Sequence, residues 1–84
     1  MMLKDRIYEV FYEIAGNYGV ELVPLRGDTV LLECGLDSLA FAALVARLEE
    51  KLGYDPFVMT DEPIYPRTID DFIGIYERFF SEHK

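Results

Sequence analysis

The chain has 84 residues, enough for one small domain with a core of its own. About half of the residues are apolar and 14% are aromatic, which excludes a disordered tail. Sixteen acidic residues against eight basic ones give a formal net charge of −8. This balance disfavours nucleic acid and anionic membranes as partners, because both bind clustered lysine and arginine. A basic protein partner would suit it better.

Cysteine content and charge distribution indicate the cellular location of the protein. Cys34 is the only cysteine, so no disulfide can form within the chain, and a cytoplasmic location is expected. The first eighteen residues contain several charges and do not resemble a signal peptide. No apolar run is long enough to span a bilayer. We therefore expect a soluble monomer in which residues 1–84 form a single domain.

The first third of the sequence predicts one helix and one long loop. Apolar residues recur at spacings of three and four over residues 3–18, which predicts an amphipathic helix that Gly19 ends. Residues 20–37 have no sustained period and contain proline and glycine. We expect a loop there, with a helical turn near residues 29–32. A strand over residues 20–22 would have no partner.

A second helix is predicted over residues 38–52, ending at Gly53. One arc of this helix should face the core: Phe41, Leu44, Val45, Leu48 and Leu52. Small apolar residues lie on roughly the opposite side: Leu39, Ala42, Ala43 and Ala46. Such a patch is unusual on a solvated face. The helix either binds a partner there or is buried on two sides, or the alanines serve helix propensity alone.

The last third predicts a short helix and a long one. Three prolines within residues 53–67 exclude a long helix, and a helical turn is expected near residues 60–64. Thr68 and Asp71 approximate a capping box, which predicts a final helix over residues 69–82. The expected fold is all-α: a small four-helix bundle with a long loop between helices one and two and a short third helix.

The sequence Gly-Leu-Asp-Ser-Leu, residues 35–39, lies where the long loop meets the second helix. A serine at this point is exposed and close to a helix N-terminus, where backbone N–H groups and the helix dipole favour an anion. Ser38 is therefore a suitable place to attach a phosphodiester. In the purely structural alternative, Asp37 and Ser38 only cap the helix.

This arrangement resembles the attachment site of the acyl and peptidyl carrier proteins, where phosphopantetheine is joined to the serine of an Asp-Ser-Leu motif. The resemblance covers most of the chain. Residues 31–39 are similar to the loop and motif of these carriers, residues 48–53 to the end of their second helix, and residues 68–72 to the start of their last helix. The resemblance implies a carrier rather than an enzyme.

The resemblance also implies a role for each motif residue. Ser38 would receive 4′-phosphopantetheine from coenzyme A through a separate phosphopantetheinyl transferase, and Asp37 would help that enzyme and its metal engage the site. Leu36 and Leu39 would frame the surface that partners recognise. The thiol at the end of the arm would hold acyl or aminoacyl groups as thioesters.

Departures from the family pattern bear on the pathway. Fatty-acid-synthase carriers typically have acids shortly after the motif, whereas residues 40–43 are neutral here and Glu49 is the first acid of the helix. Partner docking should therefore rely on apolar contact through Leu39, Ala42, Ala43 and Ala46. This favours a free-standing carrier in a secondary-metabolite or specialised acyl pathway, loaded by an adenylating enzyme. The alternatives are fatty-acid or polyketide elongation, or an unmodified helical interaction module.

Other chemistry is weakly supported. The single histidine, His83, is next to the C-terminal residue, where fraying would prevent it from positioning Ser38 as a hydrolase nucleophile. The Gly-x-Ser-x-Gly nucleophile motif is absent. Cys34 and His83 have no partners at ligand spacing, so no metal site is expected.

Overall fold

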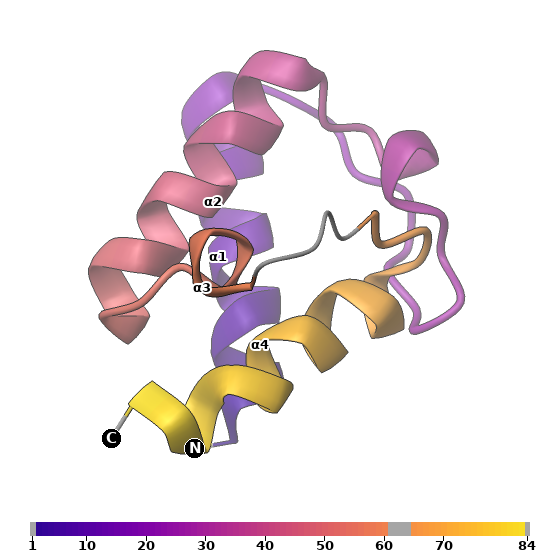
Figure 1. The fold of residues 1–84 in the computed structure, drawn as a ribbon. Coiled ribbons are helices and arrows are strands. Elements are labelled where there is room, and N and C mark those ends of the chain that lie inside the picture. Colours follow the sequence, from indigo (N-terminus) through magenta and orange to yellow (C-terminus); the bar gives the residue numbers. More distant parts are fainter. Residues whose placement is uncertain (1, 61–64, 84) are drawn as a thin grey trace.

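The computed structural model describes residues 2–60 and 65–83 and is built from helices (Figure 1). In chain order these are α1 (Leu3–Tyr18), the 3₁₀ turn η1 (Leu31–Glu33), α2 (Ser38–Leu52), α3 (Pro56–Met59) and α4 (Ile69–His83). The described residues form no β-strand, only an isolated bridge between Val30 and Thr68. The all-α prediction is confirmed, and so is the long loop between the first two helices.

Two of the long helices end at the predicted glycines, and the last one begins at the predicted capping residues. Gly19 and Gly53 adopt left-handed backbone conformations, with φ of 64° and 85°, directly after α1 and α2. At the start of α4 the Thr68 hydroxyl accepts a hydrogen bond from the Asp71 amide at 3.1 Å, and the Asp71 carboxylate accepts one from the Thr68 amide at 3.2 Å. This reciprocal pair is a capping box. The Thr68 and Arg67 amides both donate to the Asp71 carboxylate, and these hydrogen bonds hold the pKa of Asp71 below its ordinary value.

The short third helix of the structure lies before the segment in which a helical turn is predicted. It was expected near residues 60–64, but Thr60 is extended and residues 61–64 lie outside the described part of the chain. The structure instead places α3 at Pro56–Met59. The Asp55 carboxylate caps it by accepting a hydrogen bond from the Phe57 amide at 2.9 Å, and Pro56 suits the first helical position. The predicted turn near residues 29–32 is η1, two residues further along.

The core is formed by the facing sides of α1, α2 and α4. Phe72 of α4 is fully buried, with aromatic rings of α1, α2, α3 and α4 itself around it. Its ring centroid is 5.1–5.9 Å from those of Phe11, Phe41, Phe57 and Tyr76. Edge-to-face and tilted ring pairs of this kind add to the stability that burial alone supplies.

Two sets of polar contacts fix the elements around the motif. Glu13 of α1 pairs with Arg47 at 2.7 Å and with Lys51 at 3.4 Å, both on α2. Although desolvation opposes it, these two cations lower the pKa of Glu13. The Leu31 amide donates to the Arg67 carbonyl at 2.9 Å, which ties η1 to the segment before α4.

Two buried tyrosines offer a test of the packing. The Tyr54 hydroxyl donates to the Tyr76 carbonyl at 2.7 Å, whereas the buried Tyr76 hydroxyl has no hydrogen-bond partner among the described residues. We expect Tyr54→Phe to lower the free energy of unfolding by about 1 kcal/mol, and Tyr76→Phe to leave it unchanged or raise it. Urea unfolding of both variants would measure this. A loss for Tyr76→Phe equal to that for Tyr54→Phe would contradict it.

Candidate functional site

Ser38 is the first residue of α2, and its side chain is exposed. The residue before it performs the capping: Asp37 has an extended backbone, and its Oδ1 accepts a hydrogen bond from the Ala40 amide at 2.7 Å. Within the described part of the chain the Ser38 hydroxyl makes no hydrogen bond. Asp37, and not Ser38, therefore caps the helix. The Ser38 hydroxyl is not used in a structural hydrogen bond among the described residues.

Gly35 holds the motif against the long loop. Its φ is +121°, a conformation that residues with a Cβ rarely adopt. A Cβ there would lie 2.5 Å from the Glu21 carbonyl oxygen, so the backbone of residues 21–22 leaves no space for one. The Val23 amide donates to the Cys34 carbonyl at 2.9 Å beside this contact. This structural role of Gly35 was not predicted from the motif.

Leu36 does not lie where the sequence analysis placed it. Its side chain is only 8% exposed and belongs to the core, as does Cys34, which is fully buried. Leu36, the residue directly before the Asp37 cap, is thus anchored in the core by its own side chain and leaves little surface for a partner. An aperiodic loop gives no sign of which side chains turn inward, so this burial could not be predicted, and a role of Leu36 in partner recognition stays a prediction.

Only part of the α2 surface that is expected to contact partners is exposed. Ser38, Ala42 and Ala46 are exposed and follow one another at intervals of four, which makes a single ridge on the helix. Leu39, beside this ridge, is 66% exposed. Ala43 differs: it is half-buried against the core and lies one turn before Arg47, whose ion pair with Glu13 marks the side facing α1.

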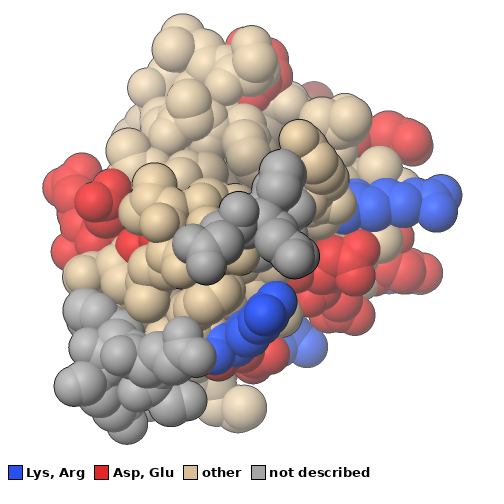
Figure 2. Space-filling view, in the orientation of Figure 1, with Lys and Arg blue, Asp and Glu red and all other residues tan. Residues whose placement is uncertain are grey.

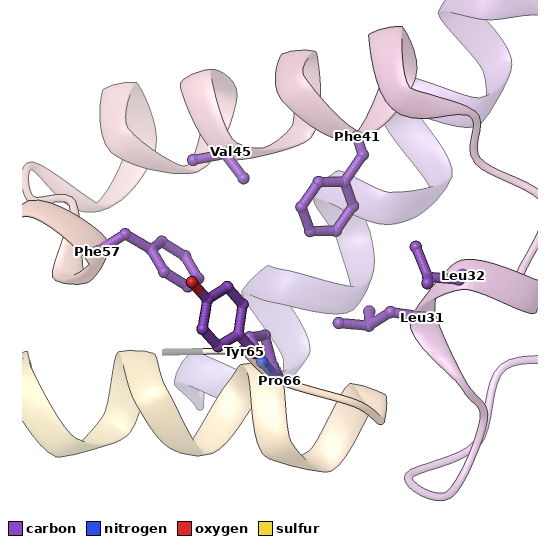
Figure 3. Close-up of a pocket in the computed structure, with 7 residues that line it drawn as sticks. All are labelled: Leu31, Leu32, Phe41, Val45, Phe57, Tyr65 and Pro66. Carbon is purple, nitrogen blue, oxygen red and sulfur yellow. The ribbon is translucent and has the colours of Figure 1, made fainter. Parts of the chain in front are cut away.

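A pocket of about 480 Å³ opens on the other side of the same ridge (Figure 3). Residues of η1, α2, α3 and the segment before α4 line it: Leu31, Leu32, Phe41, Val45, Phe57, Tyr65 and Pro66. Phe41 and Val45 were expected in the closed core, but both are only half-buried and form one wall of this hollow. Nothing in the sequence pattern predicts this pocket.

The surface around the start of α2 is largely uncharged. In Figure 2 the upper part of the molecule is mostly tan, and acidic side chains gather at its margins. Figure 1 places the first turns of α2 in this region. The two cations of α2, Arg47 and Lys51, both form ion pairs with Glu13 of α1. The site therefore offers apolar contact and an accessible hydroxyl.

Comparison with known families gives a clear result. Residues 10–60, more than half of the chain, match the family model described as the phosphopantetheine attachment site. The chain belongs to this family. It is thus a carrier protein, on which 4′-phosphopantetheine is attached covalently, and not an enzyme. Carriers of this kind interact with a phosphopantetheinyl transferase and with acyl-handling enzymes. Neither the comparison with curated proteins nor that with solved structures gives a match.

The residues present fit such a group. The exposed hydroxyl lies at a helix N-terminus, where backbone dipoles favour a phosphodiester, and the capping carboxylate leaves that hydroxyl without an internal partner. In the part of the chain that the structure describes, no cluster of three or more histidine, cysteine or acidic side chains could hold a metal ion. None of the described helices is long and apolar enough to cross a membrane.

Proposed function

We propose that Ser38 carries the arm of this carrier and that its thiol holds acyl groups for partner enzymes. In the attachment step, Ser38 Oγ bonds to the β-phosphorus of coenzyme A, and the hydroxyl proton passes to the transferase or to solvent. The pyrophosphate bond breaks, and adenosine 3′,5′-bisphosphate leaves. The observation that carries the proposal is the position of Ser38: exposed, at the first residue of α2 and relieved of capping by Asp37.

The attachment itself is tested by intact mass. The purified apo-protein is incubated with coenzyme A and a broad-specificity phosphopantetheinyl transferase, beside a control carrier that proves the enzyme active. We expect the mass to rise by one phosphopantetheine. An unchanged mass in a folded sample, also when a transferase from the source of this chain is used, would oppose the proposal.

Asp37 serves two purposes in this proposal, and two substitutions separate them. Asp37→Ala removes the cap and should lower the free energy of unfolding by about 1 kcal/mol. Asp37→Asn keeps a capping oxygen and should leave that free energy nearly unchanged. Both remove the carboxylate that we propose the transferase recognises, so both should slow attachment. If Asp37→Asn were modified at the parent rate, the recognition role of the charge would be wrong.

We further propose that partners dock on the exposed ridge of α2, through Ala42 and Ala46, and on Leu39 beside it. The first charged residue of α2 is Arg47, so the first two turns offer only apolar contact. This supports a carrier of a specialised acyl pathway loaded by an adenylating enzyme. It gives less support to fatty-acid elongation.

The ridge is tested by placing a charge in it. Ala42→Glu should raise the KM of loading several-fold, because the carboxylate would be desolvated against an apolar partner surface. Its free energy of unfolding should stay within about 0.5 kcal/mol of the parent, as for other exposed sites. Tyr12→Glu, also at an exposed apolar position but on α1, is the matched control and should load normally. Equal KM values for the two variants would exclude this docking face.

A further inference from the structure

A second hollow, a groove of about 430 Å³, lies along the outer face of α4. Tyr65 and Pro66, which precede α4, form part of its lining, and α4 itself contributes residues that include Asp70, Gly74 and Arg78. Among the described residues that line the groove, none belongs to α2. The groove is therefore separate from the docking ridge that we propose on α2.

The residue at the middle of this groove is a glycine that the fold of one copy does not require. Gly74 is exposed in the interior of α4, and a Cβ there would meet no atom within 4 Å. Its backbone does not have a positive φ. Glycine within a helix is less stable than alanine, so its presence has a cost that packing among the described residues does not explain. A missing side chain does allow another helix to approach α4 closely.

Side chains of opposite charge lie on the two sides of this glycine. Asp70 is four residues before Gly74 and Arg78 is four residues after it, which places each charge about 6 Å from Gly74 along the axis. In the described part of the chain, neither Asp70 nor Arg78 belongs to an ion pair. The groove thus has a negative end and a positive end, both exposed to solvent.

The surface around the groove is also close to neutral, unlike the protein as a whole. The exposed charged residues between positions 67 and 78 are three acids and two bases: Arg67, Asp70, Asp71, Glu77 and Arg78. Their net charge is −1, against −8 for the whole chain. Figure 2 shows acidic and basic side chains together on the part of the surface where Figure 1 places α4. Two copies of the protein would therefore repel each other weakly across this face.

We infer that a second copy of this chain docks in the groove, so that the protein forms a two-fold symmetric dimer through α4. A two-fold axis brings the same surface of both copies together and reverses the direction of one helix. The two α4 helices then cross at Gly74, and Asp70 of each copy faces Arg78 of the other. Tyr65, whose side chain is 87% exposed, loses contact with water in this dimer. The paired charges set the register of the two helices.

The dimer should be weak, because stable dimers bury about 800 Å² of each partner and this contact is centred on a single groove. The monomer expected from the sequence is then the form present at low concentration. Association through α4 does not depend on attachment at Ser38, so either proposal can fail without the other.

Sedimentation equilibrium measures the association of the purified protein between about 10 μM and 1 mM, in a reducing buffer that prevents disulfides through Cys34. We expect the average mass of the parent to rise from monomer toward dimer over this range. Gly74→Gln should remain monomeric where the parent associates, because its side chain holds the two helices apart. Gly16→Gln is the matched control. It adds the same atoms at an exposed glycine of α1 that also has no atom within 4 Å, and it should associate like the parent.

A charge exchange tests the antiparallel register. Arg78→Asp and Asp70→Lys each place like charges opposite each other in the symmetric dimer, so each variant alone should stay monomeric. An equimolar mixture of the two restores both opposite-charge pairs and should form a 1:1 dimer. Because the Asp70 carboxylate also lies close to Gly27 of the long loop, circular dichroism first establishes that each variant is folded.

Three results would overturn the inference. A parent that is still monomeric at the highest concentration would show that a second copy does not occupy the groove. Association that persists in Gly74→Gln would place the contact on another face of the molecule. If the mixture of folded charge variants associated no more than either variant alone, Asp70 and Arg78 would not face each other across a two-fold axis. Gly74→Gln decides the question by itself if a charge variant does not fold.

Discussion

Gly35→Ala is expected to lower the free energy of unfolding by about 2–4 kcal/mol. Two causes add at this position. The backbone has φ of +121°, which an L-residue with a Cβ adopts only with strain, and the new methyl group would meet the Glu21 carbonyl oxygen at 2.5 Å. Because that oxygen belongs to backbone, relief requires the loop to move away from the motif. Urea unfolding followed by circular dichroism would measure the loss.

Gly16→Ala is the matched control. Gly16 lies in the last turn of α1, and a Cβ there would meet no atom within 4 Å. Alanine should therefore raise the free energy of unfolding by about 0.5–1 kcal/mol, as expected when glycine is replaced within a helix. Equal stability of Gly35→Ala and the parent would show that the loop tolerates the side chain, and the account of Gly35 as a close-contact glycine would be wrong.

The consequence for modification follows from the position of Gly35. If the loop moves, the backbone that leads into the Asp37 cap moves with it, and Ser38 is presented less uniformly to the transferase. We expect folded Gly35→Ala to be modified more slowly than the parent. This makes the glycine of the motif a structural residue, distinct from the residue proposed to be modified.

The long helices could be predicted because their signals are local. Apolar spacing defines α1 and α2, and each is followed directly by a glycine that ends it. The start of α4 could be predicted because the two residues of its capping box, Thr68 and Asp71, are only three residues apart in the sequence. The helix α3 at Pro56–Met59 was not predicted, although its signal was also local. Asp55 followed by Pro56 is a cap and a favoured first helical residue, and that pair was overlooked.

The site could be predicted only as far as its motif extends. Asp37 and Ser38 were identified because they are adjacent to the start of a periodic helix. The inward orientation of Leu36 depends on how the loop packs, and the constraint on Gly35 depends on Glu21, fourteen residues earlier. The half-buried position of Ala43 depends on where α1 lies. None of these follows from spacing within the motif.

The pocket had no sequence signal because distant segments build it. The Leu31 amide bonds to the Arg67 carbonyl, and the Ile69 amide bonds to the Thr29 carbonyl at 3.0 Å. These contacts join η1 to the segment before α4 across nearly forty residues. Phe41 and Val45 have the spacing of core residues, and only the arrangement of the neighbouring segments leaves them open on one side.

The central claim is that Ser38 bears the arm, and the chain offers a strict comparison because it contains two serines, Ser38 and Ser81. Ser38→Ala should abolish attachment while changing the free energy of unfolding by less than a lost cap would, since Asp37 is the capping residue. Ser81→Ala should be modified like the parent.

The measurement to make is the intact mass of the parent, Ser38→Ala and Ser81→Ala after incubation with coenzyme A and an active phosphopantetheinyl transferase. The account predicts a gain of one phosphopantetheine in the parent and in Ser81→Ala, and none in Ser38→Ala. A gain in Ser38→Ala, with the parent modified to the same extent, would place the arm on another residue and contradict the account.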